Sequence, residues 1–381
     1  MAKGIELAGA KHTAFVEWNA DACKTLRHNY QADLVHEVDV RQFDFEQFSG
    51  VDLIAGGPPC QPFSMGGKAK GFDDERDMFP YAVTAIRQLA PKGFIFENVK
   101  GLLRKSFAEY FNYILLQLTY PEITNNTHDW KHHLAELKRV DIAGNYRGLK
   151  YDVVFRLVNA ANYGIPQKRE RVIIVGIRND LNVAWEFPTE THSEEALLWS
   201  KYVTGAYWAA HGICPTPADL LCQTLERERL TKKHGFFPPA LKPWLTIRDT
   251  IADLPNPQVV TAFHPEHYHR GGARAYPGHT GSDIDQPSKA LKAGDHGVPG
   301  GENMIRFTDG SVRYLTILEA KRMQTFPDEY PILGSWTEAM RQLGNAVPVK
   351  LGQVIAESLI PELAAATPTA TIVRAAELVL A

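Results

Sequence analysis

One cysteine of this chain stands where covalent chemistry would be easy to arrange. Cys60 lies in the run 56–64 (GGPPCQPFS), directly after the apolar segment 51–55 (VDLIA), which is typical of a buried strand. Two prolines precede the thiol, fix the backbone and remove two N–H donors, so the side chain is presented in one geometry. The stretch 65–71, rich in glycine and lysine, predicts a basic loop. A rigid thiol beside such a loop favours nucleophilic catalysis on an anionic substrate.

A carboxylate and a guanidinium occupy comparable places at other strand ends. Glu97 lies near the end of the apolar segment 93–99, and Arg169 and Arg171 lie in the charged run 167–171 (QKRER). Each alone has an ordinary explanation, as a cap or as part of a charged turn. Because open α/β sheets bind ligands at the carboxyl ends of their strands, a thiol, a carboxylate and a guanidinium gathered there predict an active site.

The elements that must position these groups alternate along the first half of the chain. Apolar segments predict strands, and apolar residues at helical spacing predict helices between them. This alternation predicts a doubly wound α/β sheet. The expected strands are 13–17, 51–55, 93–99, 153–158 and 171–177, and the expected helices are 21–30 and 79–89.

The chain divides into three parts by composition. Residues 1–188 form the predicted α/β domain. Residues 189–306 are rich in Pro, Gly, His and Trp with weak periodicity, and predict a smaller, irregular domain. Residues 307–381 return to the first domain, with helices expected at 315–323 and 349–363.

Bulk composition restricts the function only a little. The chain has 381 residues, a formal net charge of -3 and four scattered cysteines without a CxxC pair. This pattern predicts a reducing, cytoplasmic location, with no membrane span and no secretory signal. A net charge near zero does not exclude nucleic acid, which needs only a local basic surface. His264, His267 and His269 have a spacing that a metal could use, but with no cysteine beside them we expect no metal site.

Five stretches together resemble the DNA (cytosine-5) methyltransferases of bacterial restriction–modification systems. They occur in the family's order from near the start to past residue 345, and the combination is highly specific. The stretches are 56–64 (GGPPCQPFS), 97–99 (ENV), 167–172 (QKRERV), 313–327 (RYLTILEAKRMQTFP) and 344–348 (GNAVP). The resemblance implies a doubly wound sheet that uses S-adenosylmethionine, and makes residues 189–306 a target-recognition domain.

The resemblance also implies a mechanism and a role for each catalytic residue. The Cys60 thiolate would add to C6 of a cytosine flipped out of duplex DNA, which makes C5 nucleophilic toward the methyl group. Glu97 would donate a proton to N3, with Asn98 helping to hold Glu97 and the cofactor side of the site. Arg171 would bind the base at O2, and Arg169 would support the site or contact a phosphate.

Cofactor and DNA contacts are implied in the same way. Glu17 would accept hydrogen bonds from the ribose hydroxyls of S-adenosylmethionine, Trp18 would pack on its adenine, and Asp39 would accept from the adenine amino group. The cofactor residues implied are Glu17, Trp18, Asp39, Val40, Pro58, Asn345 and Val347. The DNA contacts expected are Gln61, Ser64, Lys68, Lys70, Arg76, Lys232, Lys233, Arg270 and Arg274.

The sequence departs from the family at its beginning. The family opens with a strand and a Phe-x-Gly-x-Gly turn that holds the methionine part of the cofactor, and residues 1–9 align with the helix after that turn. The strand would lie in the middle of the sheet, so its absence predicts unpaired backbone groups on two neighbours and weak cofactor binding. A late start codon, a truncated gene or a separate polypeptide would each explain this, and we favour the first two.

The expected function is methylation of cytosine C5 within a specific sequence of double-stranded DNA. Two alternatives remain, namely an RNA (cytosine-5) methyltransferase of the transfer-RNA type and a catalytically impaired DNA-binding remnant. A cognate restriction endonuclease would be a partner in the same system, and we expect the protein to be a monomer.

Overall fold

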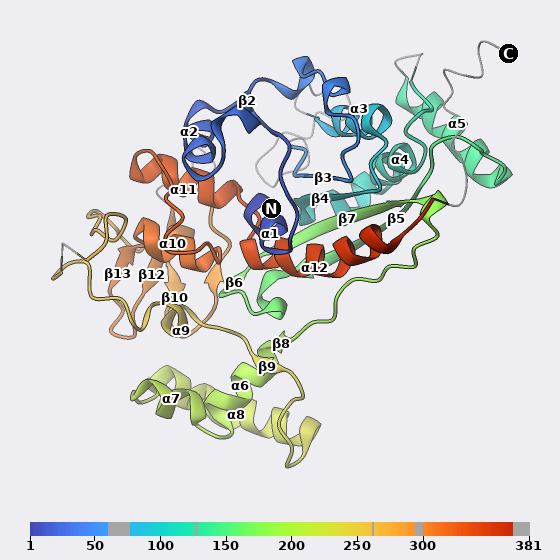
Figure 1. Cartoon of the computed structure of the whole chain (residues 1–381). Helices are drawn as coiled ribbons and strands as arrows, with labels where there is room; N and C mark the ends of the chain where they lie inside the picture. The colour runs from blue at the N-terminus through green and yellow to red at the C-terminus, as the bar shows by residue number, and fades with distance from the viewer. Residues whose placement is uncertain (60–76, 126–128, 261–262, 294–299, 369–381) are drawn as a thin grey trace, which may run out of the picture.

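The computed structural model describes residues 1–59, 77–125, 129–260, 263–293 and 300–368 (Figure 1). Its largest sheet has the strand order β3-β4-β7-β5, in which β3 and β4 are parallel and the other neighbours are antiparallel. The strands are β3 (Leu53–Gly56), β4 (Gly93–Val99), β5 (Tyr151–Asn159) and β7 (Glu170–Arg178). The four strands predicted from apolar segments in this region are confirmed.

A second, smaller sheet holds the strands nearest the N-terminus. β1 (Phe15–Glu17) and β2 (Val35–Glu37) pair in parallel, and α2 (Ala20–Asn29) connects them. No hydrogen bonds join β1 to β3 in the described parts of the chain. The α/β class is therefore confirmed, and β1–β2 and the four-stranded sheet are separate in the described residues, as expected where a middle strand is missing.

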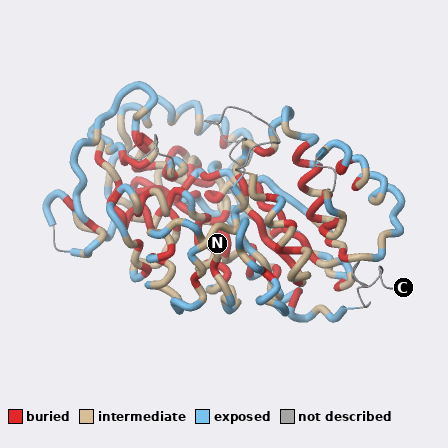
Figure 2. Tube along the Cα trace, turned by 90° about the horizontal axis from the view of Figure 1, so that it is seen from above, coloured by how far each residue is buried: buried red, intermediate tan, exposed pale blue. Residues whose placement is uncertain are grey.

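Helices cover both faces of the four-stranded sheet (Figure 1). α12 (Val349–Ala365) and α1 (Ala2–Leu7) cover one face, where Ile95, Ile173 and Leu351 are buried together. The other face packs Phe94 and Phe96 against three helices, which are α3 (Phe79–Leu89), α4 (Ala108–Thr119) and α5 (Trp130–Ala143). The alternation of inward residues along β4 thus supplies two cores, which Figure 2 shows as buried stretches through the middle of the molecule.

Residues 189–306 form two units rather than one irregular domain. One is helical and is connected to the rest of the protein at the short parallel pair of β8 (His192–Ser193) and β9 (Lys242–Pro243) (Figure 1). The other shares a core with the C-terminal segment, around Ile305, Leu315 and Met340. The helical unit contains α6 (Glu194–Tyr202), α7 (Ala206–His211) and α8 (Pro217–His234). The second unit and the segment after it contain α9 (Ile247–Ile251), β10 (Ser282–Asp283), β12 (Met304–Arg306), β13 (Val312–Tyr314), α10 (Ile317–Met323) and α11 (Trp336–Asn345).

The helices of this unit were not expected from the sequence, and α8 explains why. Of its residues only Leu230 is buried, so the helix lacks a strong apolar stripe. Its start is fixed by a capping box in which Thr216 and Asp219 each bond to the other's backbone.

A further short parallel pair, β6 (Gln167–Lys168) with β11 (Ser288–Lys289), joins the first domain to the second unit of residues 189–306. No helix in the described residues is long and apolar enough to cross a membrane.

Gly176 shows how tightly the main sheet is packed. A Cβ placed there would lie 2.1 Å from the Phe94 ring, and Phe94 is fully buried. We expect Gly176→Ala to lower the free energy of unfolding by about 1–3 kcal/mol, because the ring cannot move without disturbing the core. Urea unfolding measures this. Gly271→Ala is the control, since a Cβ there has nothing closer than 4.0 Å, and an equal loss for both variants would contradict the packing argument.

Candidate active site

The carboxylate of Glu97 and the guanidinium of Arg171 form an ion pair between β4 and β7. Val99 lies directly opposite Arg171 in the antiparallel register. Glu97, two residues earlier on β4, shares the face of Arg171, so the pairing follows from the pleat. The two side chains are only 11% and 15% exposed, respectively. Two of the groups predicted from sequence are therefore brought together.

The turn that leads to Cys60 lies against this ion pair. A Cβ on Gly57 would be 3.2 Å from Oε2 of Glu97, so glycine allows the turn to approach the carboxylate. Asn98, which is 4% exposed, donates from Nδ2 to the Pro58 carbonyl at 2.9 Å. Its Oδ1 accepts from the Val99 N–H at 2.8 Å. Asn98 thus holds the proline turn through Pro58, one of the residues predicted for the cofactor side.

The Met78 N–H donates to the Pro59 carbonyl at 3.1 Å, so the chain leaves and re-enters the described structure at one place. Residues 60–76 fall between these two points. Cys60 itself, and the predicted DNA contacts Gln61, Ser64, Lys68, Lys70 and Arg76, lie outside the described residues.

Arg169 points into the protein rather than toward a ligand surface. It is 1% exposed and donates to the carbonyls of Leu291 and Gly344 at 3.2 and 2.7 Å. Burial lowers the pKa of its guanidinium to about 9. A Cβ on Gly344 would lie 2.7 Å from the backbone of Lys292, so glycine is required for this close approach. Of the two roles predicted for Arg169, the geometry fits support of the site.

We expect Arg169→Met to lower the free energy of unfolding by about 2–4 kcal/mol, because it removes two hydrogen bonds from a charged donor and leaves two buried carbonyls unpaired. Thermal or urea unfolding measures the loss. Arg41→Met is the matched control, since Arg41 pairs with Asp39 on the surface and surface pairs contribute little. A loss of the same size in both variants would contradict the anchoring role.

The residues predicted for the cofactor lie at the ends of β1 and β2. Because these strands are parallel and Glu17 pairs with Glu37, Glu17 and Asp39 lie at the same edge. The Trp18 side chain is 77% exposed, which leaves a large aromatic surface beside Glu17. Asp39 accepts hydrogen bonds from the Arg41 backbone and guanidinium, and the Arg41 interaction lowers the pKa of Asp39. Val40 follows in the same turn.

The remaining cofactor residues come from elsewhere in the chain. Asn345 ends α11 and is exposed, while Val347 is 6% exposed and packs in the core beneath α12. Pro58 presents its carbonyl to Asn98, as described above. An exposed aromatic ring with carboxylates at one strand edge suits a cationic ligand that carries an adenosine group.

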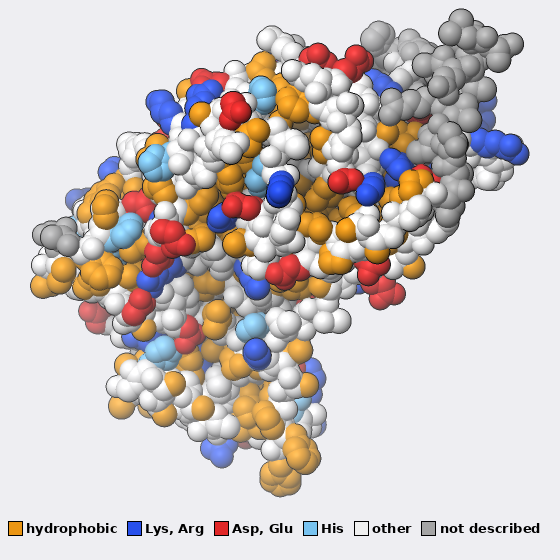
Figure 3. Space-filling view, in the orientation of Figure 1, with side chains coloured by type: hydrophobic (Ala, Val, Ile, Leu, Met, Phe, Trp, Pro, Cys, Tyr) orange, Lys and Arg blue, Asp and Glu red, His pale blue; other side chains and the backbone are white. Residues whose placement is uncertain are grey.

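The DNA contacts predicted in the second domain come from two parts of it. Lys232 and Lys233 lie at the end of α8, and Lys233 pairs with Glu195 at 2.7 Å. Arg270 stacks its guanidinium over the Trp336 ring at 4.7 Å, next to α11, far from the end of α8 (Figure 1). Arg274 is exposed. In Figure 3 cationic and anionic side chains are interspersed over the visible face.

His267 is held by hydrogen bonds through both ring nitrogens. Nδ1 contacts Thr316 Oγ1 at 3.0 Å and Nε2 contacts the Pro255 carbonyl at 2.7 Å. Nearby, Lys321 is fully buried and bonds to Glu266 and to the Asp328 carbonyl. These contacts anchor the loop that carries Arg270 onto α10. The hydrogen bonds of His267 therefore have a structural role.

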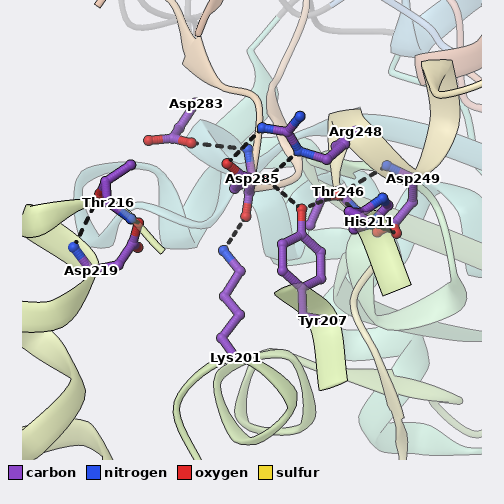
Figure 4. A network of polar contacts seen from close by, with 10 residues as sticks. All are labelled: Lys201, Tyr207, His211, Thr216, Asp219, Thr246, Arg248, Asp249, Asp283 and Asp285. Carbon is purple, nitrogen blue, oxygen red and sulfur yellow. Dashed lines mark hydrogen bonds and ion pairs between the residues drawn. The ribbon is translucent and has the colours of Figure 1, made fainter. Parts of the chain in front are cut away.

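A buried polar network was not predicted from sequence. Lys201 is 1% exposed and donates to the Asp285 carbonyl, and Tyr207 and Arg248 bond to the Asp285 carboxylate at 2.7 Å each (Figure 4). Burial lowers the pKa of Lys201. The network fixes the helical unit to the neighbouring unit. The only sequence signal was a lysine among apolar residues of α6, at 197–202.

With this geometry, comparison with known proteins defines the class. A family model described as C-5 cytosine-specific DNA methylase matches residues 1–121 and 123–361. The chain therefore belongs to this family. The resemblance to restriction–modification DNA (cytosine-5) methyltransferases drawn from the sequence is confirmed.

Curated relatives cover nearly the whole chain. The type II methyltransferase M.NgoMIV of Neisseria gonorrhoeae is 30% identical over 370 residues, which is 95% of this chain and 94% of the relative. The type II methyltransferase M.PspPI of Psychrobacter sp. (strain TA137) is 32% identical over 375 residues, with 96% and 77% covered.

Solved structures agree on the fold. A putative DNA modification methyltransferase encoded within an E. coli prophage has a TM-score of 0.55 at 17% identity, covering 95% of this chain and 96% of that one. The S. pombe Dnmt2 methyltransferase has a TM-score of 0.53 at 17% identity, with 95% of each chain covered. At this identity the likeness concerns the fold alone.

Proposed function

We propose that this protein transfers a methyl group from S-adenosylmethionine to C5 of a cytosine flipped out of a specific duplex DNA sequence, through a covalent bond between Cys60 and C6. The observation that carries the proposal is the Glu97–Arg171 ion pair packed against Gly57, at the turn that precedes Cys60. A carboxyl group and a guanidinium beside the residues that directly precede Cys60 support the proposal.

Each residue has a defined part in the proposed reaction. The Cys60 thiolate forms a bond to C6 while Glu97, which must carry a proton when the base is bound, gives that proton to N3, so the ring becomes an enamine whose C5 is nucleophilic. Arg171 donates hydrogen bonds to O2 and keeps the Glu97 carboxyl oriented. S-adenosylmethionine, when bound, supplies the methyl group as an electrophile. A base, such as a water molecule, then takes the C5 proton, the Cys60–C6 bond breaks to restore the thiolate, and the N3 proton returns to Glu97.

The described residues fit the proposed cofactor at the edge formed by β1 and β2. Glu17 offers carboxylate oxygen to ribose hydroxyls, and the exposed Trp18 ring offers a surface for adenine. Asp39 would have to share its carboxylate between Arg41 and the adenine amino group. Both carboxylates favour a cationic sulfonium ligand, and Val40, Pro58, Asn345 and Val347 complete the proposed pocket.

A methyl-transfer assay on duplex DNA and on transfer RNA tests the proposal. We expect incorporation into DNA at cytosine C5, and a product on transfer RNA alone would favour the RNA methyltransferase alternative. Absence of transfer to either, with retained DNA binding, would favour the impaired remnant. Run on this chain and on a version extended upstream, the same assay also tests the expectation of weak cofactor binding.

We expect DNA binding to weaken with rising salt, because Lys and Arg side chains replace counterions on phosphates. Arg274→Ala and Lys232→Ala should each reduce the slope of log K against log salt concentration by about 1 if the residue contacts a phosphate. Lys138→Ala on α5, where the lysine is also exposed, is the control. An unchanged slope in either test variant would remove that residue from the interface.

A further inference from the structure

The outer edge of the four-stranded sheet is formed by β5, a strand of nine residues. Its only strand partner among the described residues is β7. Hydrogen bonds at its two ends show which backbone groups point toward β7. The Asn179 N–H donates to the Lys150 carbonyl, and the Ala160 N–H donates to the Arg169 carbonyl. Even-numbered residues therefore direct their backbone groups to β7, and the odd-numbered Val153, Phe155 and Leu157 direct theirs outward.

This edge is also apolar for a surface strand. Val154, Phe155 and Leu157 are 40%, 44% and 37% exposed. On the α4 face, Phe155 makes an edge-to-face contact with Phe111 at 4.8 Å, and its remaining surface is open. A long edge strand with apolar side chains and outward N–H and C=O groups is a template for pairing with another strand.

The charged residues of β5 match those of a second copy of the same strand. Asp152 and Arg156 share the α12 face, two residues on either side of Val154. If a second copy of β5 pairs antiparallel with a two-fold axis at Val154, Asp152 of each copy lies opposite Arg156 of the other. In the same register Val153 lies opposite Phe155, and Val154 opposite itself. Charge and apolar surface thus match in one isologous arrangement.

We propose that two copies of this protein associate through antiparallel pairing of β5, which joins their sheets into one continuous sheet. The outward backbone groups of Val153 and Phe155 supply the inter-subunit hydrogen bonds, and the two Asp152–Arg156 pairs set the register. This dimer replaces the monomer expected from sequence. It is independent of the proposed function, since Glu97 lies on β4 and is separated from β5 by β7.

Charge reversal tests the proposal by sedimentation equilibrium over a range of micromolar concentrations. We expect the full chain to show a concentration-dependent dimer. Arg156→Asp places like charges opposite each other at both symmetric positions and should raise the dissociation constant about tenfold or more, and Asp152→Arg should do the same. The double variant Asp152→Arg with Arg156→Asp restores opposite charges across the axis, so it should restore the dimer.

Two controls separate this result from a folding defect. Residues 152 and 156 are on one strand and do not pair with each other within a subunit, so rescue by the double variant reports contact between subunits. Lys24→Asp on α2, an exposed position with the same charge change, should leave the dimer intact. Three results would each overturn the proposal. The full chain could be a monomer at every concentration, both single variants could leave the dissociation constant unchanged, or the double variant could stay dissociated.

Discussion

Cys60→Ser is expected to abolish methyl transfer, with kcat lowered by roughly 10⁴-fold or more, because a serine hydroxyl is a far weaker nucleophile toward C6 than a thiolate. DNA binding should persist, since the substitution changes one atom and removes no charge contact to phosphate. Radioactive methyl incorporation under single-turnover conditions, beside a gel-shift titration, measures the two effects separately.

The other cysteines supply the controls for this variant. Burial raises the pKa of Cys23 to about 11, and its thiol donates to the Glu17 carbonyl at 3.3 Å, so it is a poor nucleophile. Cys222 is exposed on α8, in the helical unit. Cys222→Ser should therefore keep the full rate. Normal turnover by Cys60→Ser, or loss of turnover in both variants, would contradict the assignment of the nucleophile.

Glu97→Gln is expected to lower kcat by about 10²–10⁴-fold, because the amide cannot donate the proton that N3 needs as the thiolate adds. The amide oxygen can still accept from Arg171, so the neighbouring side chain keeps a partner. Single-turnover kinetics at saturating DNA and cofactor measures the chemical step directly.

Glu170→Gln is the matched control for Glu97→Gln. Glu170 precedes Arg171 and pairs with Lys100 at 2.8 Å, but it is 44% exposed and lies on the surface. We expect less than a twofold change in kcat, in line with the small contribution of surface ion pairs. If both variants lose activity equally, the special role of Glu97 is refuted.

The elements around the site could be predicted because their signals are local. The segments 51–55 and 93–99 are apolar and short, and each proved to be a strand. Glu97 lies near the carboxyl end of β4 and Arg171 near the amino end of β7, and the antiparallel pairing of the two strands brings them to one edge. These are consequences of pattern and pleat, which a single sequence contains.

Other features depend on contacts between distant segments and could not be predicted. Asn98 bonds to Pro58 and Arg169 bonds to Gly344, a residue 175 positions away. The helical unit was missed because α8 buries only Leu230, and the role of Lys201 was missed because its partner lies 84 residues away. In each case the deciding partner is set by tertiary structure rather than by local propensity.

The position of β1 can also be compared with the prediction from sequence. The family resemblance predicted that a strand is missing from the middle of the sheet, and in the described residues β1 pairs with β2 and not with β3. Glu17 and Asp39 still lie at one edge, since they depend only on the parallel pairing of these two strands. The proposed cofactor contacts therefore rest on local geometry that the separation of β1 from β3 leaves unchanged.

The central claim is that Cys60 bonds to C6 of the target cytosine, and covalent trapping tests it most directly. Duplex DNA of mixed sequence with 5-fluorocytosine in place of cytosine cannot lose a proton from C5, so the adduct should persist after methyl transfer. Peptide mapping by mass spectrometry is then expected to find the nucleotide on the peptide that contains Cys60. Methylation of ordinary DNA without a trapped adduct, or an adduct on Cys23, Cys214 or Cys222, would contradict the account.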